Sequence, residues 1–105
     1  MNNTKTFLTS MLLTAIALLL TTQAEAQSQE TFCGYVEENA ALTMELRQQG
    51  VRMSKVMSVA GGSLEEKIIK DAYGMPRHNT EFLMEVAVEE FANKWYRGCL
   101  EATND

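Results

Sequence analysis

The chain has 105 residues and a formal net charge of −5, with 14 acidic against 9 basic side chains. This acidic balance argues against a nucleic-acid partner, because phosphate binding needs a basic surface. A chain of this length makes one small domain, and the core of such a domain is marginal without a covalent or metal staple.

Residues 1–26 are predicted to be a removable signal peptide. A short polar start precedes the mostly apolar stretch Phe7–Leu20, and Ala24-Glu25-Ala26 supplies the small-x-small pattern that a signal peptidase recognises. The apolar stretch is too short to span a bilayer comfortably. We therefore expect a periplasmic or secreted protein with no integral membrane segment after cleavage, in which residues 27–105 form a single small helical domain.

The two cysteines, Cys33 and Cys99, lie near the two ends of this expected domain. In an oxidising compartment they permit only one pairing. The bond would close most of the domain into one loop, which is worth roughly 4 kcal/mol in the chain-entropy model. A free or redox-active pair and a metal site are the alternatives, and the metal site lacks further ligands because His78 is the only histidine. We expect the disulfide, with no metal and no cofactor.

Helical signals dominate the rest of the sequence, which has one proline and no strand-length window in which β-branched residues alternate. The first helix is predicted over Thr31–Gln49, and Gly50 ends it because glycine accepts the left-handed conformation of a helix C-terminus. Its apolar face has helical spacing and consists of Cys33, Val36, Ala40 and Met44.

Two short helices are predicted next. The first covers Ser54–Ala60, with the Ser54 hydroxyl as its N-cap. The second begins at Ser63, ends before Gly74 and starts with the capping-box pattern Ser-x-x-Glu that is completed by Glu66.

A loop over Met75–Asn79 leads to the last predicted helix, Thr80–Leu100, which Asn79 or Thr80 would cap. One amphipathic stripe defines the face of this helix that is expected to be buried. The stripe consists of Met84, Val88, Phe91, Trp95 and Cys99. A Cys33–Cys99 bond would make the two long helices antiparallel neighbours. The expected fold is therefore all-α, with two long antiparallel helices joined by a hairpin of two short helices at the end far from the disulfide.

Three segments carry a resemblance to a known group of proteins. They are residues 44–54 (MELRQQGVRMS), 72–77 (AYGMPR) and 90–99 (EFANKWYRGC). Together with Cys33, they resemble a family of short exported helical proteins of proteobacteria and their prophages. The resemblance covers nearly all of residues 27–105. It supports the helical fold and the exported compartment and implies no particular chemistry.

No catalytic constellation is evident in the sequence. A hydrolytic triad needs a nucleophile, a base and an orienting group, and His78 lies in a loop two residues after the proline. Adjacent carboxylates such as Glu89 and Glu90 point about 100° apart on a helix, so they do not face one substrate. Four soft or borderline ligands suggest a copper site as a weaker alternative, although methionines at helical spacing are more often core residues. They are Met53, Met57, Met75 and His78. We expect a protein that is not an enzyme.

The charge is uneven along the chain, since residues 47–77 are net basic and the stretches on either side are net acidic. A candidate binding surface at this basic tip consists of Arg47, Arg52, Lys55, Tyr73 and Arg77. Arginine and tyrosine are favoured at interfaces because they combine large area with directional hydrogen bonds. The alternative is an ordinary helix corner in which Val51 and Met53 pack inward.

The sequence therefore favours a non-catalytic, interaction or inhibitor-like protein that binds another exported or envelope protein. The alternative function is an envelope stress chaperone of the small helical acid-stress type. The small size and the single disulfide fit that class as well.

Overall fold

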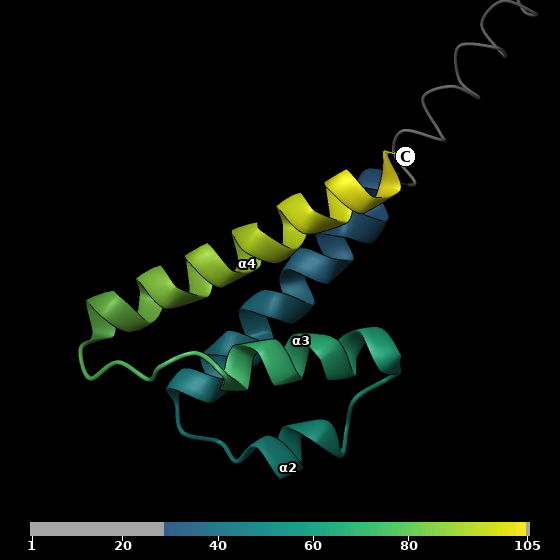
Figure 1. Cartoon of the computed structure of the whole chain (residues 1–105). Coiled ribbons are helices and arrows are strands. Elements are labelled where there is room, and N and C mark those ends of the chain that lie inside the picture. The colour runs from purple at the N-terminus through teal and green to yellow at the C-terminus, as the bar shows by residue number, and fades with distance from the viewer. Residues whose placement is uncertain (1–28, 105) are drawn as a thin grey trace, which may run out of the picture. The chain divides into compact units, whose positions relative to one another are not determined.

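The computed structural model describes residues 29–104, and in this part of the chain the fold is all-α with no strand (Figure 1). Four helices follow one another: α1 over residues 29–48, α2 over Met53–Met57, α3 over Ser63–Tyr73 and α4 over Glu81–Thr103. No helix within residues 29–104 has the length and apolar character needed to cross a membrane. The predicted signal peptide lies outside the described residues and stays a prediction.

A disulfide joins the beginning of α1 to the end of α4. Cys33 and Cys99 are bonded, with their Cα atoms 5.6 Å apart. At the other end of the pair, Glu45 of α1 and Glu81 of α4 line the same groove. The two long helices are therefore antiparallel neighbours, as the cysteine positions predicted, and the expected fold class is confirmed.

The helix α3 extends farther than expected along the long pair. The Tyr35 hydroxyl, near the disulfide, donates a hydrogen bond to Glu65 at the start of α3. At the opposite end, the Arg47 guanidinium donates to the backbone carbonyl of Met75, just after α3. The short helices do form a hairpin between α1 and α4, but α3 packs beside the long pair as a third helix instead of remaining at the far end (Figure 1).

The core lies where α1, α3 and α4 meet. Its buried residues are Cys33, Val36, Ala40, Met44, Ile68, Ala72, Phe91 and Cys99. The predicted apolar face of α1 is confirmed in full. On α4, Val88 and Trp95 are partly buried against this cluster. Met84, the first residue of the predicted stripe, instead lines a groove between α1 and α4.

The ends of the two long helices follow their sequence signals. Gly50 has a φ of +84°, and the backbone N–H groups of Gly50 and Val51 donate to the carbonyls of Arg47 and Leu46. This pair of bonds is the Schellman motif, which satisfies carbonyls that the helix leaves unpaired. At the start of α4, the Thr80 side chain accepts a hydrogen bond from the N–H of Leu83. The predicted stop at Gly50 and the predicted Thr80 cap are both confirmed.

The predicted serine caps of the short helices are wrong. α2 begins at Met53 with Arg52 as its N-cap, so Ser54 already lies in the first turn. α3 has Gly62 as its N-cap, and Ser63 is its first residue. A capping serine needs a non-helical backbone, and Gly62 occupies that position because its carbonyl accepts the first helical bond from the N–H of Glu66.

Candidate binding surfaces

Two residues of the predicted basic surface, Arg47 and Tyr73, connect the segments that meet at the end of the fold far from the disulfide. The Arg47 Nε and Nη2 atoms donate to the Met75 carbonyl at 3.2 and 3.1 Å, and the guanidinium carbon lies 5.3 Å from the centre of the Tyr73 ring. The Tyr73 hydroxyl donates to the Val51 carbonyl at 2.6 Å. Burial raises the pKa of this hydroxyl, and the nearby Arg47 charge opposes the rise. Both side chains therefore join α1, the turn after it and the end of α3.

Arg77, in the loop after α3, contacts the end of α1 in the same region. Its Nη2 atom donates to the backbone carbonyl of Gln48 at 3.4 Å. The guanidinium also lies against Gly50, where an added Cβ would come within 2.8 Å of Nη2. A cation at the C-terminus of α1 interacts favourably with the negative end of the helix dipole. Arg77 is nevertheless exposed, so one side of it faces solvent.

Arg52 and Lys55 complete the predicted surface. Both are exposed, and within residues 29–104 neither side chain has a hydrogen bond or an ion pair. Val51 and Met53 beside them are half-buried, as the helix-corner interpretation expects. The structure thus brings Arg47, Tyr73 and Arg77 together in a corner with internal contacts and leaves Arg52 and Lys55 open. A binding role for these five residues stays a prediction.

Gln48 is the residue of this corner that sequence reasoning missed. Its side chain is 2% exposed; Nε2 donates to the Pro76 carbonyl at 3.0 Å, and Oε1 accepts from the backbone N–H of His78 at 2.8 Å. Nε2 also lies 3.3 Å from the Met44 sulfur. One buried amide therefore fixes the loop that precedes α4. A glutamine in the last turn of a helix carries no sequence signal for this role.

Neither His78 nor Met75, two of the residues considered for catalysis or metal binding, is fully exposed. His78 is half-buried and borders an apolar groove. Among residues 29–104, no three His, Cys, Asp or Glu residues are placed to hold a metal ion. Of the methionines considered for copper, Met75 packs against the core.

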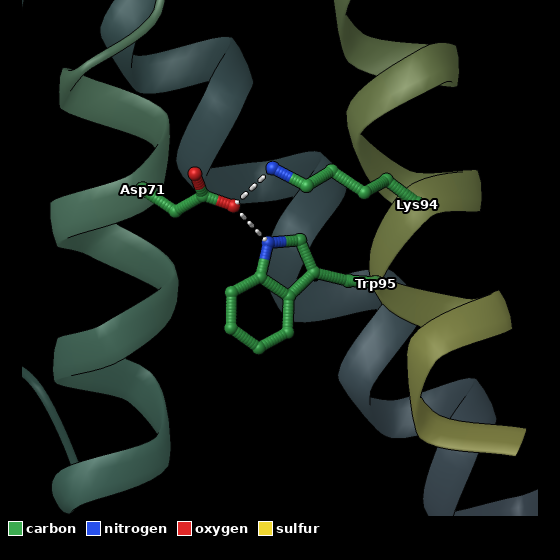
Figure 2. Close-up of polar contacts among 3 residues, drawn as sticks. All are labelled: Asp71, Lys94 and Trp95. Carbon is green, nitrogen blue, oxygen red and sulfur yellow. Dashed lines mark hydrogen bonds and ion pairs between the residues drawn. The ribbon is translucent and has the colours of Figure 1, made fainter. Parts of the chain in front are cut away.

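A polar cluster links α3 to α4 in the middle of the domain. Figure 2 shows the Asp71 carboxylate of α3 facing Lys94 and Trp95 of α4. Its Oδ2 atom accepts from Lys94 Nζ at 2.8 Å and from Trp95 Nε1 at 2.9 Å. The indole thereby gains a hydrogen-bond partner while its ring packs on the core, as partly buried tryptophans usually do. Asp71–Lys94 is the one ion pair within the described part of the chain.

The first half of α4 carries an apolar surface that lies outside the amphipathic stripe predicted from the sequence. Six of the ten residues 81–90 are apolar, yet no residue of α4 is buried before Phe91. Phe82 is 71% exposed and Leu83 is 42% exposed, and Val86 follows one turn later. We call Phe82, Leu83 and Val86 the outer stripe. A helix that is apolar on several faces is normally buried, so the run Phe82-Leu83-Met84 followed by Val86-Ala87-Val88 was the available signal.

A groove runs along one side of the outer stripe. It has a volume of about 400 Å³, and its lining includes Met44 and Met75. The wall contributed by α4 consists of Leu83, Val86, Ala87, Glu90, Phe91 and Lys94. A second groove, of about 550 Å³, lies on the other side of α4 and is bordered by Glu45, Gln49, Glu81, Met84, Glu85, Val88 and Glu89. The first half of α4 therefore projects as an apolar ridge with glutamates around it.

No family model, curated protein or solved structure matches this chain. The resemblance to the family of short exported helical proteins therefore stays a prediction, and what the surfaces do has to be argued from their own chemistry.

Proposed function

We propose that this protein is a small non-catalytic binding protein of the periplasm or the extracellular space. Its partner is another exported or envelope protein. The single observation that carries the proposal is the outer stripe, in which Phe82 is 71% exposed and Leu83 is 42% exposed on the half of α4 that precedes its first buried residue, Phe91. An exposed apolar patch with polar residues around it is typical of a protein-binding site. The disulfide supports an oxidising compartment.

Affinity capture tests this function. The exported protein, with its disulfide intact, is immobilised and exposed to an extract of the envelope and the periplasm from the cells that make it. We expect one or a few proteins to be retained, and we expect Phe82→Ser to reduce their retention because it removes the most exposed aromatic side chain of the stripe. Val59→Ser is the matched control, since Val59 is 80% exposed and lies in the turn after α2. Equal retention by the wild type, Phe82→Ser and Val59→Ser would contradict the proposal.

The predicted basic surface can be tested in the same assay. Arg52→Ala with Lys55→Ala removes two exposed cations that have no internal partners in the described part of the chain, so folding should be unchanged. If these cations contact the partner, capture should weaken most at low salt, where charges are least screened. Unchanged capture at every salt concentration would remove them from the binding surface.

The acid-stress chaperone is the second candidate function, and the glutamates around the outer stripe favour it. In strong acid carboxylates gain protons, which would leave an exposed apolar face without its charged border. A chaperone of this type should suppress aggregation of many unrelated proteins at about pH 3 and bind none of them at neutral pH. A partner-specific protein should bind at neutral pH and give no protection in acid.

A further inference from the structure

We infer that the outer stripe of α4 binds a cationic amphipathic helix of the partner, with the apolar side chains of that helix in the groove beside the stripe and its lysines or arginines against the glutamates. This inference rests on the proposed function, because it names the chemistry of the partner at the same surface.

The shape of the surface fits a helix better than a flat contact. Phe82 and Val86 are separated by one turn and therefore lie on one face of α4. Leu83 and Val86 also form the wall of the groove of about 400 Å³. Amphipathic helices bind by placing apolar side chains at successive turns into such a groove. Met75 suits this use, because it lines the groove, is only half-buried and has a flexible thioether chain that can adapt to different occupants.

The charge of the surface selects the sign of the occupant. Residues 81–90 contain four glutamates and no basic residue. Glu89 and Glu90 are exposed, and they follow Val86 by three and four positions, so both border the outer stripe. Lys94 of α4 also lines the groove, and its ammonium group is 2.8 Å from the Asp71 carboxylate. This cation is therefore already paired with a carboxylate, whereas Glu89 and Glu90 have no ion pair within residues 29–104.

Charge complementarity also decides against two other occupants. In a symmetric dimer through α4, the glutamates that border the outer stripe would be brought to one interface from both copies, and like charges across an interface are unfavourable. An anionic lipid surface would be repelled in the same way. A partner with apolar residues flanked by lysine or arginine gains from both features of the stripe.

Two designed peptides test the inference directly. Both carry leucine at i, i+3, i+4 and i+7 on one helical face, and one has lysine at the remaining positions where the other has glutamate. Binding to the exported protein, disulfide intact, is measured by fluorescence anisotropy at low and at high salt. We expect the lysine peptide to bind at least about tenfold more tightly than the glutamate peptide, with the difference shrinking as salt screens the charges.

Variants of the protein separate the apolar contribution from the electrostatic one. Phe82→Ser with Leu83→Ser should weaken binding of the lysine peptide by about tenfold or more, as expected for apolar anchors. Glu89→Gln with Glu90→Gln should also weaken it and reduce the salt dependence. The matched control is Glu37→Gln with Glu38→Gln, an adjacent pair of glutamates on α1. Circular dichroism verifies that each variant is folded. If the serine variant fails to fold, the two glutamate pairs still provide the test.

Three results would overturn the inference. The first is equal binding of the two peptides, and the second is an equal effect of the two glutamate-pair substitutions on binding. The third is a dimer of the chain alone that Phe82→Ser dissociates, which would make a second copy the occupant. Failure of the inference is distinguishable from failure of the proposed function. A partner captured through Phe82 but insensitive to Glu89→Gln with Glu90→Gln keeps the function and rejects the cationic helix, whereas no Phe82-dependent capture rejects the function.

Discussion

The Gln48 side chain is almost fully buried and has two polar partners in the loop that leads into α4. Its amide nitrogen serves the Pro76 carbonyl, and its amide oxygen serves the N–H of His78. Side chains that satisfy two loop backbone groups at once determine the loop conformation, because an unpaired buried polar group is costly. The position of His78, and with it one border of the groove beside the outer stripe, thus depends on one glutamine.

We predict that Gln48→Leu destabilises the domain by about 1–3 kcal/mol, since it leaves the Pro76 carbonyl and the His78 N–H without their partner. Urea unfolding followed by circular dichroism measures the change. Gln49→Leu is the control, because Gln49 is exposed at the next position and its side chain has no hydrogen bond within residues 29–104. Equal unfolding midpoints for the two variants would show that the Gln48 amide does not hold the loop.

A second prediction concerns the Tyr35–Glu65 contact, in which the hydroxyl donates to the carboxylate at 2.7 Å. This hydrogen bond, followed by a backbone hydrogen bond, lowers the pKa of Glu65, and the same bond raises the pKa of Tyr35. A lowered folded-state pKa means that Glu65 contributes stability above its unfolded pKa, and that this contribution is lost as the pH falls through the folded value. In Tyr35→Phe, the pKa of Glu65 should rise toward its ordinary value of 4.5. A carbon-detected NMR titration checks this, and an unchanged Glu65 titration would show that the hydroxyl is not its main partner.

At the scale of elements, the turn between α1 and α2 is constrained in two ways. Gly50 takes a positive φ there, and the Arg77 guanidinium lies against it where any side chain would begin. Both conditions favour glycine, one through the backbone and the other through space. The corner formed by Arg47, Tyr73 and Arg77 is built around this residue.

We therefore predict that Gly50→Ala destabilises the domain by more than about 1 kcal/mol, because alanine strains a left-handed position. Gly34→Ala is the matched control: Gly34 lies inside α1, and an added Cβ there meets nothing within 4 Å. Replacing a helical glycine by alanine should stabilise by about 0.5–1 kcal/mol. Thermal unfolding of both variants should thus give shifts of opposite sign. Two shifts of the same sign would be inconsistent with this account of the turn.

The helix ends show which local signals are sufficient on their own. Gly50 and Thr80 act as predicted because a glycine stop and a threonine cap each satisfy backbone groups of the same helix end. Ser54 and Ser63 do not, because Arg52 and Gly62 provide the extended residue before each short helix. α2 has only five residues, and α3 follows two glycines. Where each of them begins depends on where the chain must turn back onto the rest of the fold.

For the whole molecule, the sequence was informative about the fold and much less so about the surface. The two cysteines and the two long amphipathic segments determine the antiparallel pair, so this part of the prediction needs no tertiary information. Whether Arg47 is available to a partner depends on the position of the Met75 carbonyl, which is 28 residues away in the chain. The outer stripe is also a tertiary property, because only the packing of α1 and α3 shows which apolar face of α4 they leave uncovered.

The disulfide acts at the end of the domain opposite the Gly50 corner, so the two constraints hold different ends of the α1–α4 pair. Cys33 and Cys99 are separated by 66 positions, and a loop of that size is worth roughly 4 kcal/mol in the chain-entropy model. For a domain of this size, 1 kcal/mol corresponds to about 4–8 °C in Tm. We predict that reduction lowers the Tm by about 20 °C, measured by circular dichroism with and without reductant. Cys33→Ser with Cys99→Ser should match the reduced protein and be indifferent to reductant, which separates the bond from other effects of the reagent. An equal Tm for the reduced and the oxidised protein would show that packing of α1, α3 and α4 is sufficient to hold α1 and α4 together.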